Sequence, residues 1–227
     1  MDIFDMLGPI MVGPSSSHTA GAARIGNMVR AILGEEPVKT IIHLHGSFAE
    51  TGSGHGTDRA ILGGLMGFKP DDLRIPNAFE QAKAAGLSYE FDTVSLRDAH
   101  PNTAVVEVWN AADRHIIVQA CSLGGGRIVV NKIDGIDVNF NGEYNTLLVR
   151  SQDEHGTVAA VTSILNQMQI NVANMSLCRH KRGGDTLMVI ETDQHIKEQY
   201  VAFMRDLPGV LSLTYHDKEE EVFDGNA

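Results

Sequence analysis

Apolar residues in the first third of the chain recur every three or four positions, the spacing of one helix face. Ala22, Ile25 and Val29 follow this spacing and predict a helix over residues 18–33, with a glycine at the C-cap position. The serines just before it, residues 15–17, are typical N-caps. The same pattern predicts a strand over residues 38–44 and further helices over residues 57–66 and 78–85.

From about residue 89 the pattern changes to alternation of apolar and polar residues, which is typical of half-buried strands. The alternating runs cover residues 105–108, 116–118, 127–131 and 138–140. Three consecutive glycines, Gly124 to Gly126, predict a chain bend that can also receive a ligand. We therefore expect an α+β fold for this part of the chain, with helices before strands.

The last third of the chain predicts six elements in the order β-α-β-β-α-β, the arrangement of ferredoxin-like domains. They cover residues 145–150, 157–168, 170–178, 186–191, 196–204 and 210–215. Val158, Val161 and Leu165 give the first of these helices one apolar face. We expect a first domain over residues 1–142, a second over residues 143–220, and a solvated acidic tail over residues 221–227.

The composition permits a packed core and disfavours several classes of partner. Hydrophobic residues make up 43% and charged residues 21% of the chain, so global disorder is not expected. The net charge of −11 disfavours nucleic acids and anionic membranes, because both are themselves negatively charged. The sequence has no apolar run of membrane-spanning length and no basic signal region, which predicts a cytoplasmic protein.

The residues of this chain do not predict a metal site. There are two cysteines, Cys121 and Cys178, whereas an iron–sulfur cluster takes about four thiolate ligands. His43 and His45 alternate along a predicted strand, but no third or fourth ligand accompanies them in the sequence. We therefore expect two reduced thiols and no metal bound by this chain.

Hydroxyl groups and an imidazole are concentrated where the first predicted helix begins, at Ser15, Ser16, Ser17, His18 and Thr19. Unpaired backbone N–H groups and the helix dipole favour an anion at such a position. Serine hydroxyls can donate hydrogen bonds as well as cap the helix. The run can therefore bind a carboxylate or a phosphate, and the alternative is plain capping by one serine.

A second candidate segment surrounds His55, which stands between Gly54 and Gly56. We expect a glycine-rich loop here, whose backbone can approach a ligand closely. Imidazole can act as a general acid or base near neutral pH. Thr57 and Asp58 are expected to cap the helix that follows. The alternative for His55 is a surface histidine in a flexible loop.

A third candidate segment is His100-Pro101-Asn102, which stands just before a predicted strand. A proline holds the residue before it in extended geometry, so the imidazole and the amide can both point toward a substrate carboxylate. Taken alone, the tripeptide is equally compatible with an ordinary turn.

The second domain resembles an ACT domain through residues 149–156, the helix that follows, and residues 170–175, although a histidine replaces the proline usual in that family. ACT domains are regulatory modules, and many bind an amino acid between two copies. The resemblance implies effector contacts at Asp153, Gly156 and Asn171, on a strand-to-helix loop suited to a carboxylate. The alternative is a loop that only holds the fold.

Four segments of the first domain carry a more specific resemblance, namely residues 13–21, 46–60, 100–103 and 122–126. Together they resemble the β chains of the two-subunit, iron–sulfur-dependent L-serine dehydratases. The first domain of that family is shared with some phosphoglycerate dehydrogenases. The resemblance covers nearly the whole chain.

This resemblance implies a lyase subunit that takes part in converting L-serine to pyruvate and ammonia. It makes His55 and His100 proton shuttles or orienting groups, and which of the two is the base stays open. The substrate contacts that it implies are Ser15, Ser16, Ser17, His18, Thr19, Gly56, Thr57, Asp58 and Asn102. Since the chain lacks the thiols for a [4Fe–4S] cluster, an α chain must carry the cluster, and we expect the isolated chain to be inactive.

Other readings of the same residues stay open. The N-terminal residues can bind serine as an allosteric effector rather than as a substrate. A second hypothesis is a stand-alone amino-acid-sensing module that binds without catalysis, because a related domain is regulatory in a dehydrogenase. Since ACT domains often pair, we expect a homodimer within a hetero-oligomer, whereas the effector and its sign are not specified.

Overall fold

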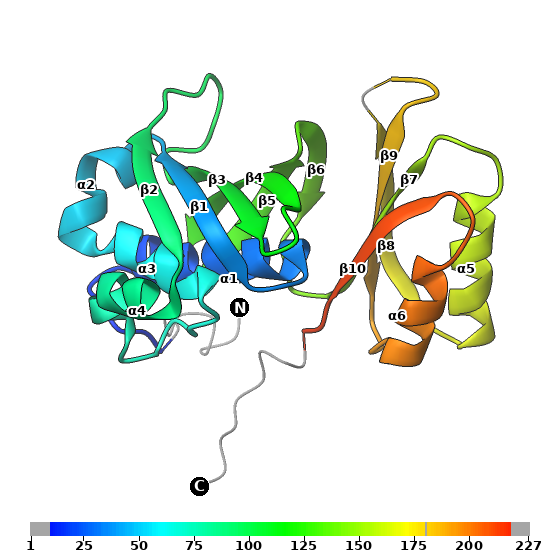
Figure 1. Cartoon of the computed structure of the whole chain (residues 1–227), viewed down its shortest axis with the longest axis horizontal. Coiled ribbons are helices and arrows are strands. Elements are labelled where there is room, and N and C mark those ends of the chain that lie inside the picture. The colour runs from blue at the N-terminus through cyan, green and yellow to red at the C-terminus, as the bar shows by residue number, and fades with distance from the viewer. Residues whose placement is uncertain (1–9, 180, 219–227) are drawn as a thin grey trace, which may run out of the picture. The chain divides into compact units, whose positions relative to one another are not determined.

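The computed structural model describes residues 10–179 and 181–218, and it divides the chain into two compact units after Gly135 (Figure 1). Both units combine helices with strands, which confirms the predicted α+β class. The predicted domain boundary between residues 142 and 143 stays a prediction. Within the described residues, no helix is both long enough and apolar enough to cross a membrane.

The larger sheet has six strands in the order β2-β1-β3-β4-β5-β6, and its edge strand β6 comes after the division at Gly135. Strand β1 is parallel to β2 and antiparallel to β3, and β4 is antiparallel to both β3 and β5. The strands are β1 (Pro37–Leu44), β2 (Ser88–Thr93), β3 (Thr103–Asn110), β4 (His115–Gly124), β5 (Arg127–Ile133) and β6 (Ile136–Phe140).

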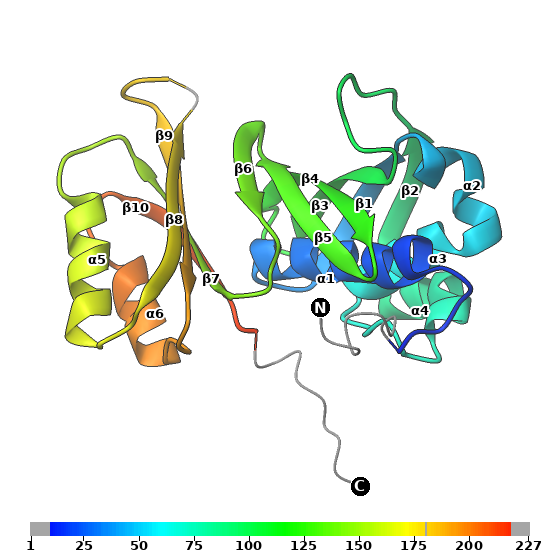
Figure 2. The same ribbon diagram turned by 180° about the vertical axis from the view of Figure 1, so that it is seen from behind.

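The helices of the first unit gather along one side of the sheet (Figures 1 and 2). They are η2 (Ser16–Gly21, a π-helix), α1 (Ala22–Leu33), α2 (Ser47–His55), α3 (Thr57–Leu65), η3 (Ile75–Asn77, a 3₁₀ helix) and α4 (Ala78–Ala85). The predicted helices at residues 57–66 and 78–85 are confirmed. The first predicted helix is also present, but its first turn is the wider π-helix η2.

Strand β3 illustrates how the alternating pattern builds the core. Ala104, Val106 and Val108 are fully buried, whereas Glu107 and Trp109 point to the other face and are half-buried. A strand places successive side chains on opposite faces, so every second apolar residue enters the core between the sheet and the helices.

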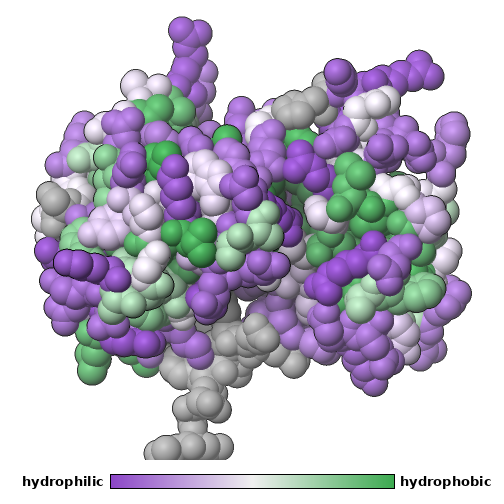
Figure 3. Space-filling model, in the orientation of Figure 1, coloured by the Kyte–Doolittle hydropathy of each residue, from purple (hydrophilic) through white to green (hydrophobic). Residues whose placement is uncertain are grey.

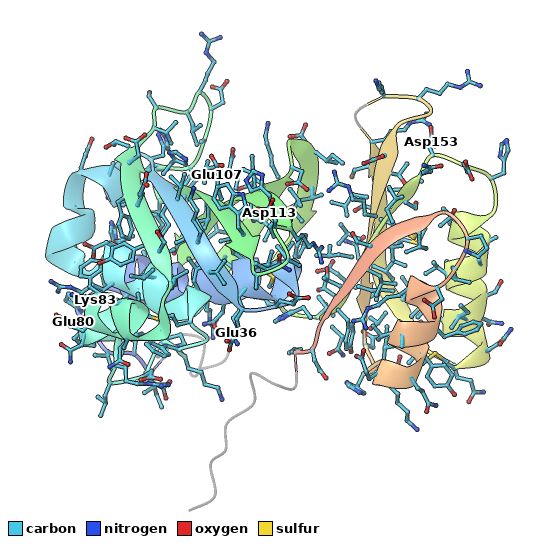
Figure 4. All side chains as sticks on the ribbon, in the orientation of Figure 1. Glu36, Glu80, Lys83, Glu107, Asp113 and Asp153 are labelled. Atoms are coloured by element: carbon cyan, nitrogen blue, oxygen red, sulfur yellow. The ribbon has the colours of Figure 1, made fainter. Side chains whose placement is uncertain are left out.

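One of the two alternating histidines of β1, His43, lies beside the carboxylate of Glu107, which is labelled in Figure 4. This carboxylate lies 3.2 Å from Nε2 of His43 and 3.3 Å from Nε2 of His115. His45 is engaged elsewhere, because its Nδ1 lies 3.2 Å from the backbone N–H of Leu96. Among the described residues, no group of three or more His, Cys, Asp or Glu side chains is arranged to hold a metal ion.

The second unit confirms the predicted β-α-β-β-α-β order. Its antiparallel sheet has the strand order β10-β7-β9-β8, and helices α5 and α6 cover one face (Figure 1). The elements are β7 (Asn145–Gln152), α5 (Thr157–Gln167), β8 (Val172–Arg179), β9 (Asp185–Thr192), α6 (Glu198–Arg205) and β10 (Val210–His216).

The core of the second unit lies between its sheet and its helices. Leu147 and Val149 of β7 pack there with Met188 and Ile190 of β9 and with Val161 of α5. The other side chains of each unit form a surface that is mainly hydrophilic on the face seen in Figure 3, with smaller hydrophobic patches.

The closest helix contact of the first unit is the crossing of α1 and α3. A Cβ atom added to Gly26 would lie 2.2 Å from the carbonyl oxygen of Ile61, and one added to Gly64 would lie 2.1 Å from that of Ala23. Both distances are far shorter than atoms tolerate, and the opposing atoms belong to the backbone. Only glycine at both positions permits this crossing.

Replacing Gly64 with alanine is therefore expected to lower the free energy of unfolding by about 3 kcal/mol, the upper range for overpacked cores. Urea unfolding followed by the fluorescence of Trp109, the single tryptophan, measures the stability of this unit. Gly54→Ala is the matched control, since a Cβ there would have no atom within 4 Å. Equal stability of the two variants would contradict the close crossing.

Candidate functional site

The imidazole of His18 is the centre of the candidate site. It lies on η2, and its Nε2 is 3.0 Å from Oγ1 of Thr51 and 3.2 Å from Oγ of Ser47, both on α2. The ring of Phe48 packs edge-on against it at 5.2 Å between centroids. The ring of His55, at the end of the same helix, lies 5.1 Å away. The site therefore joins two segments that are about thirty residues apart in the sequence.

The serines before His18 have distinct positions. Oγ of Ser15 accepts a hydrogen bond of 3.2 Å from the backbone N–H of His18 and lies 3.4 Å from Nδ1 of its ring, so Ser15 is the N-cap. Oγ of Ser16 accepts a hydrogen bond of 3.3 Å from the N–H of Gly125. Ser17 is half-buried beside the same turn, near Gly124.

The glycine turn that the sequence predicts is the hairpin between β4 and β5. Gly124, Gly125 and Gly126 all have positive φ, at 92°, 63° and 78°. Residues other than glycine rarely adopt this backbone conformation. Arg24 of α1 donates a hydrogen bond of 3.0 Å to the carbonyl of Gly126. These bonds attach the turn to η2 and α1. The residues around His18, namely Ser47, Phe48, Thr51 and His55, are called the His18 cluster below.

His55 lies at the C-terminus of α2, so the prediction of a loop at this position is wrong. Gly56 follows with φ of 74° and reverses the chain, which lets α3 begin at the next residue. The flanking glycines therefore end one helix and start another. The side chain of His55 is exposed, and a Cβ at Gly54 or Gly56 would meet no atom within 4 Å, so the surroundings are open.

Thr19 links η2 to the end of α2, since its buried Oγ1 donates a hydrogen bond of 3.3 Å to the carbonyl of His55. Neither Thr57 nor Asp58 is the N-cap residue of α3, contrary to expectation, because Gly56 occupies that position. Thr57 is instead fully buried, with no hydrogen-bond partner for its Oγ1. Asp58 accepts a hydrogen bond from the N–H of Arg59, its neighbour.

The segment His100-Pro101-Asn102 lies beside the first turn of α2 and the end of β4. The carbonyl of Pro101 accepts a hydrogen bond from the N–H of Phe48, and the carbonyl of Asn102 accepts one of 2.9 Å from Ser122. His100 is exposed, and its Nδ1 accepts a bond of 3.1 Å from the N–H of Asn102. The segment thus borders the elements that carry the site, while the ring of His100 contacts its own turn.

The structure separates the predicted effector residues of the second unit. Asp153, labelled in Figure 4, bonds to Arg179 at 2.6 Å and to the N–H of Gly183 at 2.8 Å. Its backbone pairs with Gly184, just before β9, whereas Asn171 bonds to Asp193, just after β9. One copy therefore holds Asp153 and Asn171 at opposite ends of a strand.

Gly156 is the N-cap residue of α5, with φ of 101°, and is exposed. It lies on the same loop as Asp153, so these two predicted contacts are neighbours. The hydrogen bonds to Gly183 and Arg179 also hold the pKa of the Asp153 carboxyl below its usual range.

Sequence reasoning missed Ser47 and Thr51, the two residues that contact Nε2 of His18. Their signal was present, because two hydroxyl residues four positions apart share one face of a helix. The spacing places the two hydroxyls side by side only if residues 47–55 form a helix, because residues four positions apart in a loop do not share a face.

Burial is the main influence on the charge of His18 and lowers the pKa of its imidazole. A hydrogen bond at the Ser47 backbone acts in the opposite direction, and the nearby His55 lowers the pKa further. Desolvation disfavours the charged form of histidine, so the ring is neutral near neutral pH. A neutral imidazole has one nitrogen that donates and one that accepts a hydrogen bond.

The two cysteines of the chain lie on different strands, one in each unit. Cys121 is buried in β4, where burial raises the pKa of its thiol, and Cys178 lies on β8 of the second unit. Two thiols on separate strands do not supply the four ligands that a [4Fe–4S] cluster takes. No step involving such a cluster is therefore assigned to residues of this chain.

Comparison with known proteins agrees with this architecture. Residues 145–199 match the ACT domain model, so the second unit is an ACT domain, and residues 2–88 match the model described as serine dehydratase beta chain. The chain is 41% identical over 212 residues to the probable L-serine dehydratase, beta chain, of Bacillus subtilis, which covers 93% of this chain and 96% of that protein. The chain belongs to the L-serine dehydratase beta chain family.

Two further relatives extend the comparison. The L-serine dehydratase, beta chain, of Peptoniphilus asaccharolyticus is 41% identical over 198 residues, or 86% of this chain and 88% of that protein. The D-3-phosphoglycerate dehydrogenase of Bacillus subtilis is 27% identical over 201 residues, which are 86% of this chain but 37% of that protein.

Acidification is expected to destabilise the first unit through His18. Its folded pKa lies below the unfolded value of about 6.5, so the unfolded state binds more protons as the pH falls through that value. The stabilisation is present above this pH and is lost below it, down to the folded pKa. The difference in unfolding free energy between wild type and His18→Gln should therefore shrink between about pH 7.5 and about pH 5.5.

Urea unfolding followed by Trp109 fluorescence measures this difference, and His100→Gln, which alters an exposed histidine, is the control. A wild-type advantage over His18→Gln that stays constant across the pH range would contradict the lowered pKa.

Proposed function

We propose that this chain is the β subunit of a two-chain L-serine dehydratase and that it contributes the His18 cluster to a substrate site completed by an α chain. The observation that carries the proposal is the convergence of η2 and α2 on one partly buried, neutral imidazole. Membership of the beta chain family supports it.

In this proposal the chain binds and orients L-serine, which loses water and then ammonia to give pyruvate. Ser15 and His18 would be central substrate contacts, and His55, whose exposed ring lies 5.1 Å from that of His18, would move a proton between substrate and solvent. His100 and Asn102 border this region and would orient the substrate once the α chain closes over it. The remaining proposed contacts are Ser16, Ser17, Gly56 and Asp58, whereas Thr19 and Thr57 are buried and would position these residues rather than touch the substrate.

The α chain would supply the [4Fe–4S] cluster, because this chain has two cysteines where about four thiolates are needed. The ACT domain would add regulation by an amino acid bound at Asp153, Gly156 and Asn171. Since one copy keeps Asp153 and Asn171 apart, that effector site needs two copies, which accords with a homodimer in a larger cytoplasmic hetero-oligomer. Exposed Met175 and Leu177 on the edge strand β8 are compatible with such pairing.

A second candidate function is amino-acid sensing without catalysis. The similarity to a D-3-phosphoglycerate dehydrogenase covers 86% of this chain but only 37% of that protein. The shared part is therefore an addition to an enzyme of different activity, which favours a binding role over a catalytic one. In this reading the His18 cluster would bind an amino acid as an allosteric ligand.

The two functions predict different behaviour of the purified chain. Alone, it should form no pyruvate from L-serine, whereas anaerobic co-expression with its α chain should give pyruvate together with the visible absorption of an iron–sulfur cluster. Pyruvate formation by the isolated chain would overturn the proposal. Serine binding by the isolated chain, without activity in the co-expressed complex, would favour the sensing module.

His55→Ala in the complex with the α chain should lower kcat by about a hundredfold or more, within the range for loss of a general acid or base. Pyruvate formation measures the change, and His115→Gln, on the opposite face of the β-sheet, is the control that should retain activity. Wild-type turnover by His55→Ala would remove this residue from the proton-transfer role.

A further inference from the structure

We propose that Thr51 is a positioning residue that fixes the tautomer of His18, so that Nε2 carries the ring proton and Nδ1 presents a lone pair to the site. The tautomer follows from the hydrogen bonds of this chain alone. Its consequence for substrate binding rests on the proposed function.

The hydroxyl of Thr51 has a single hydrogen, and that hydrogen is already used. Oγ1 of Thr51 donates to the carbonyl oxygen of Ser47, one helical turn earlier, at 2.8 Å. While this bond is made, Oγ1 can only accept from His18, 3.0 Å away. The Nε2 atom of His18 must be the donor in that bond, which places the ring proton on Nε2 in the neutral form.

The opposite tautomer would lose this bond. With the proton on Nδ1, either the lone pair of Nε2 would face the lone pairs of Thr51 Oγ1, or the Thr51 hydroxyl would turn toward Nε2 and lose its bond to the carbonyl of Ser47. Both arrangements lose a hydrogen bond in a partly buried position, which is unfavourable. Ser47 does not decide between the tautomers, because its Oγ, 3.2 Å from Nε2, can rotate to donate or accept. Thr51 is thus the group that discriminates.

The surroundings of Nδ1 agree with this assignment. Oγ of Ser15 accepts the backbone N–H of His18 at 3.2 Å, so its own hydrogen remains available to Nδ1, 3.4 Å away. This contact is longer than the usual hydrogen bond between a hydroxyl and a nitrogen. A ligand that donates more strongly can therefore replace it.

The assignment specifies which part of the ligand meets His18. A lone pair on Nδ1 attracts a hydrogen-bond donor and repels a carboxylate. The burial that keeps the ring neutral also removes the charge that would attract an anion. We therefore assign the ammonium group of an amino acid, rather than its carboxylate, to the His18 side of the site.

The tautomer can be read directly from long-range ¹⁵N–¹H spectra of the full chain labelled with ¹⁵N-histidine, in which His18→Gln identifies the His18 signals. Wild type and Thr51→Ser should show protonated Nε2 and unprotonated Nδ1. Thr51→Val, which has the same shape without the hydroxyl, should show a mixture of tautomers. Protonated Nδ1 in the wild type would overturn the proposal, and this result does not depend on whether Thr51→Val folds.

In the complex with the α chain, Thr51→Val should lower kcat about tenfold to a hundredfold, the range found when an orienting hydrogen bond is removed. Thr51→Ser should retain most of the activity, whereas a merely structural role would make both variants lose stability together. A changed tautomer with unchanged kcat would support the assignment of the proton and overturn the catalytic part of the proposed function.

Discussion

The crossing of α1 and α3 at Gly26 and Gly64 is the constraint on which the candidate site depends. Helix α1 continues directly from η2, which carries His18, and α3 follows directly from α2, which carries Thr51. Because the two backbones meet without intervening side chains, the segments that precede them are held side by side. The hydrogen bond from Thr19 to the end of α2 then fixes their register.

The groups that contact the His18 ring are mainly hydroxyl groups and not charged side chains. The ring of His18 is surrounded by Ser15, Ser47 and Thr51 and by the edge of a phenylalanine. None of these groups can stabilise an imidazolium as a carboxylate would, so burial prevails and the ring stays neutral. The carboxylates of Asp92 and Glu107 do lie near histidines of this unit, but these are His43 and His115 rather than His18.

Much of the fold and part of the site could be predicted from local pattern. The alternation in β3 and the apolar face of α5 have clear periods, and both elements lie where the periods predict. The exception is α2. Its glycines at positions 52 and 54, together with Gly56 just after it, are typical of a loop, so the sequence pattern did not predict a helix there. The helix forms nevertheless because Phe48 is fully buried at its start and contacts between its other residues and η2 compensate for the weak propensity.

The sequence by itself determined the order of the elements, the ACT domain and the shortage of thiols, and it marked His18 and His55 as candidate site residues. Each of these depends on residue identity or on short-range spacing. Only the tertiary structure decided that Thr51 meets Nε2 of His18 and that Asp153 and Asn171 lie at opposite ends of a strand. These are relations between segments distant in the sequence, and they are fixed by packing and backbone pairing, which no local pattern records.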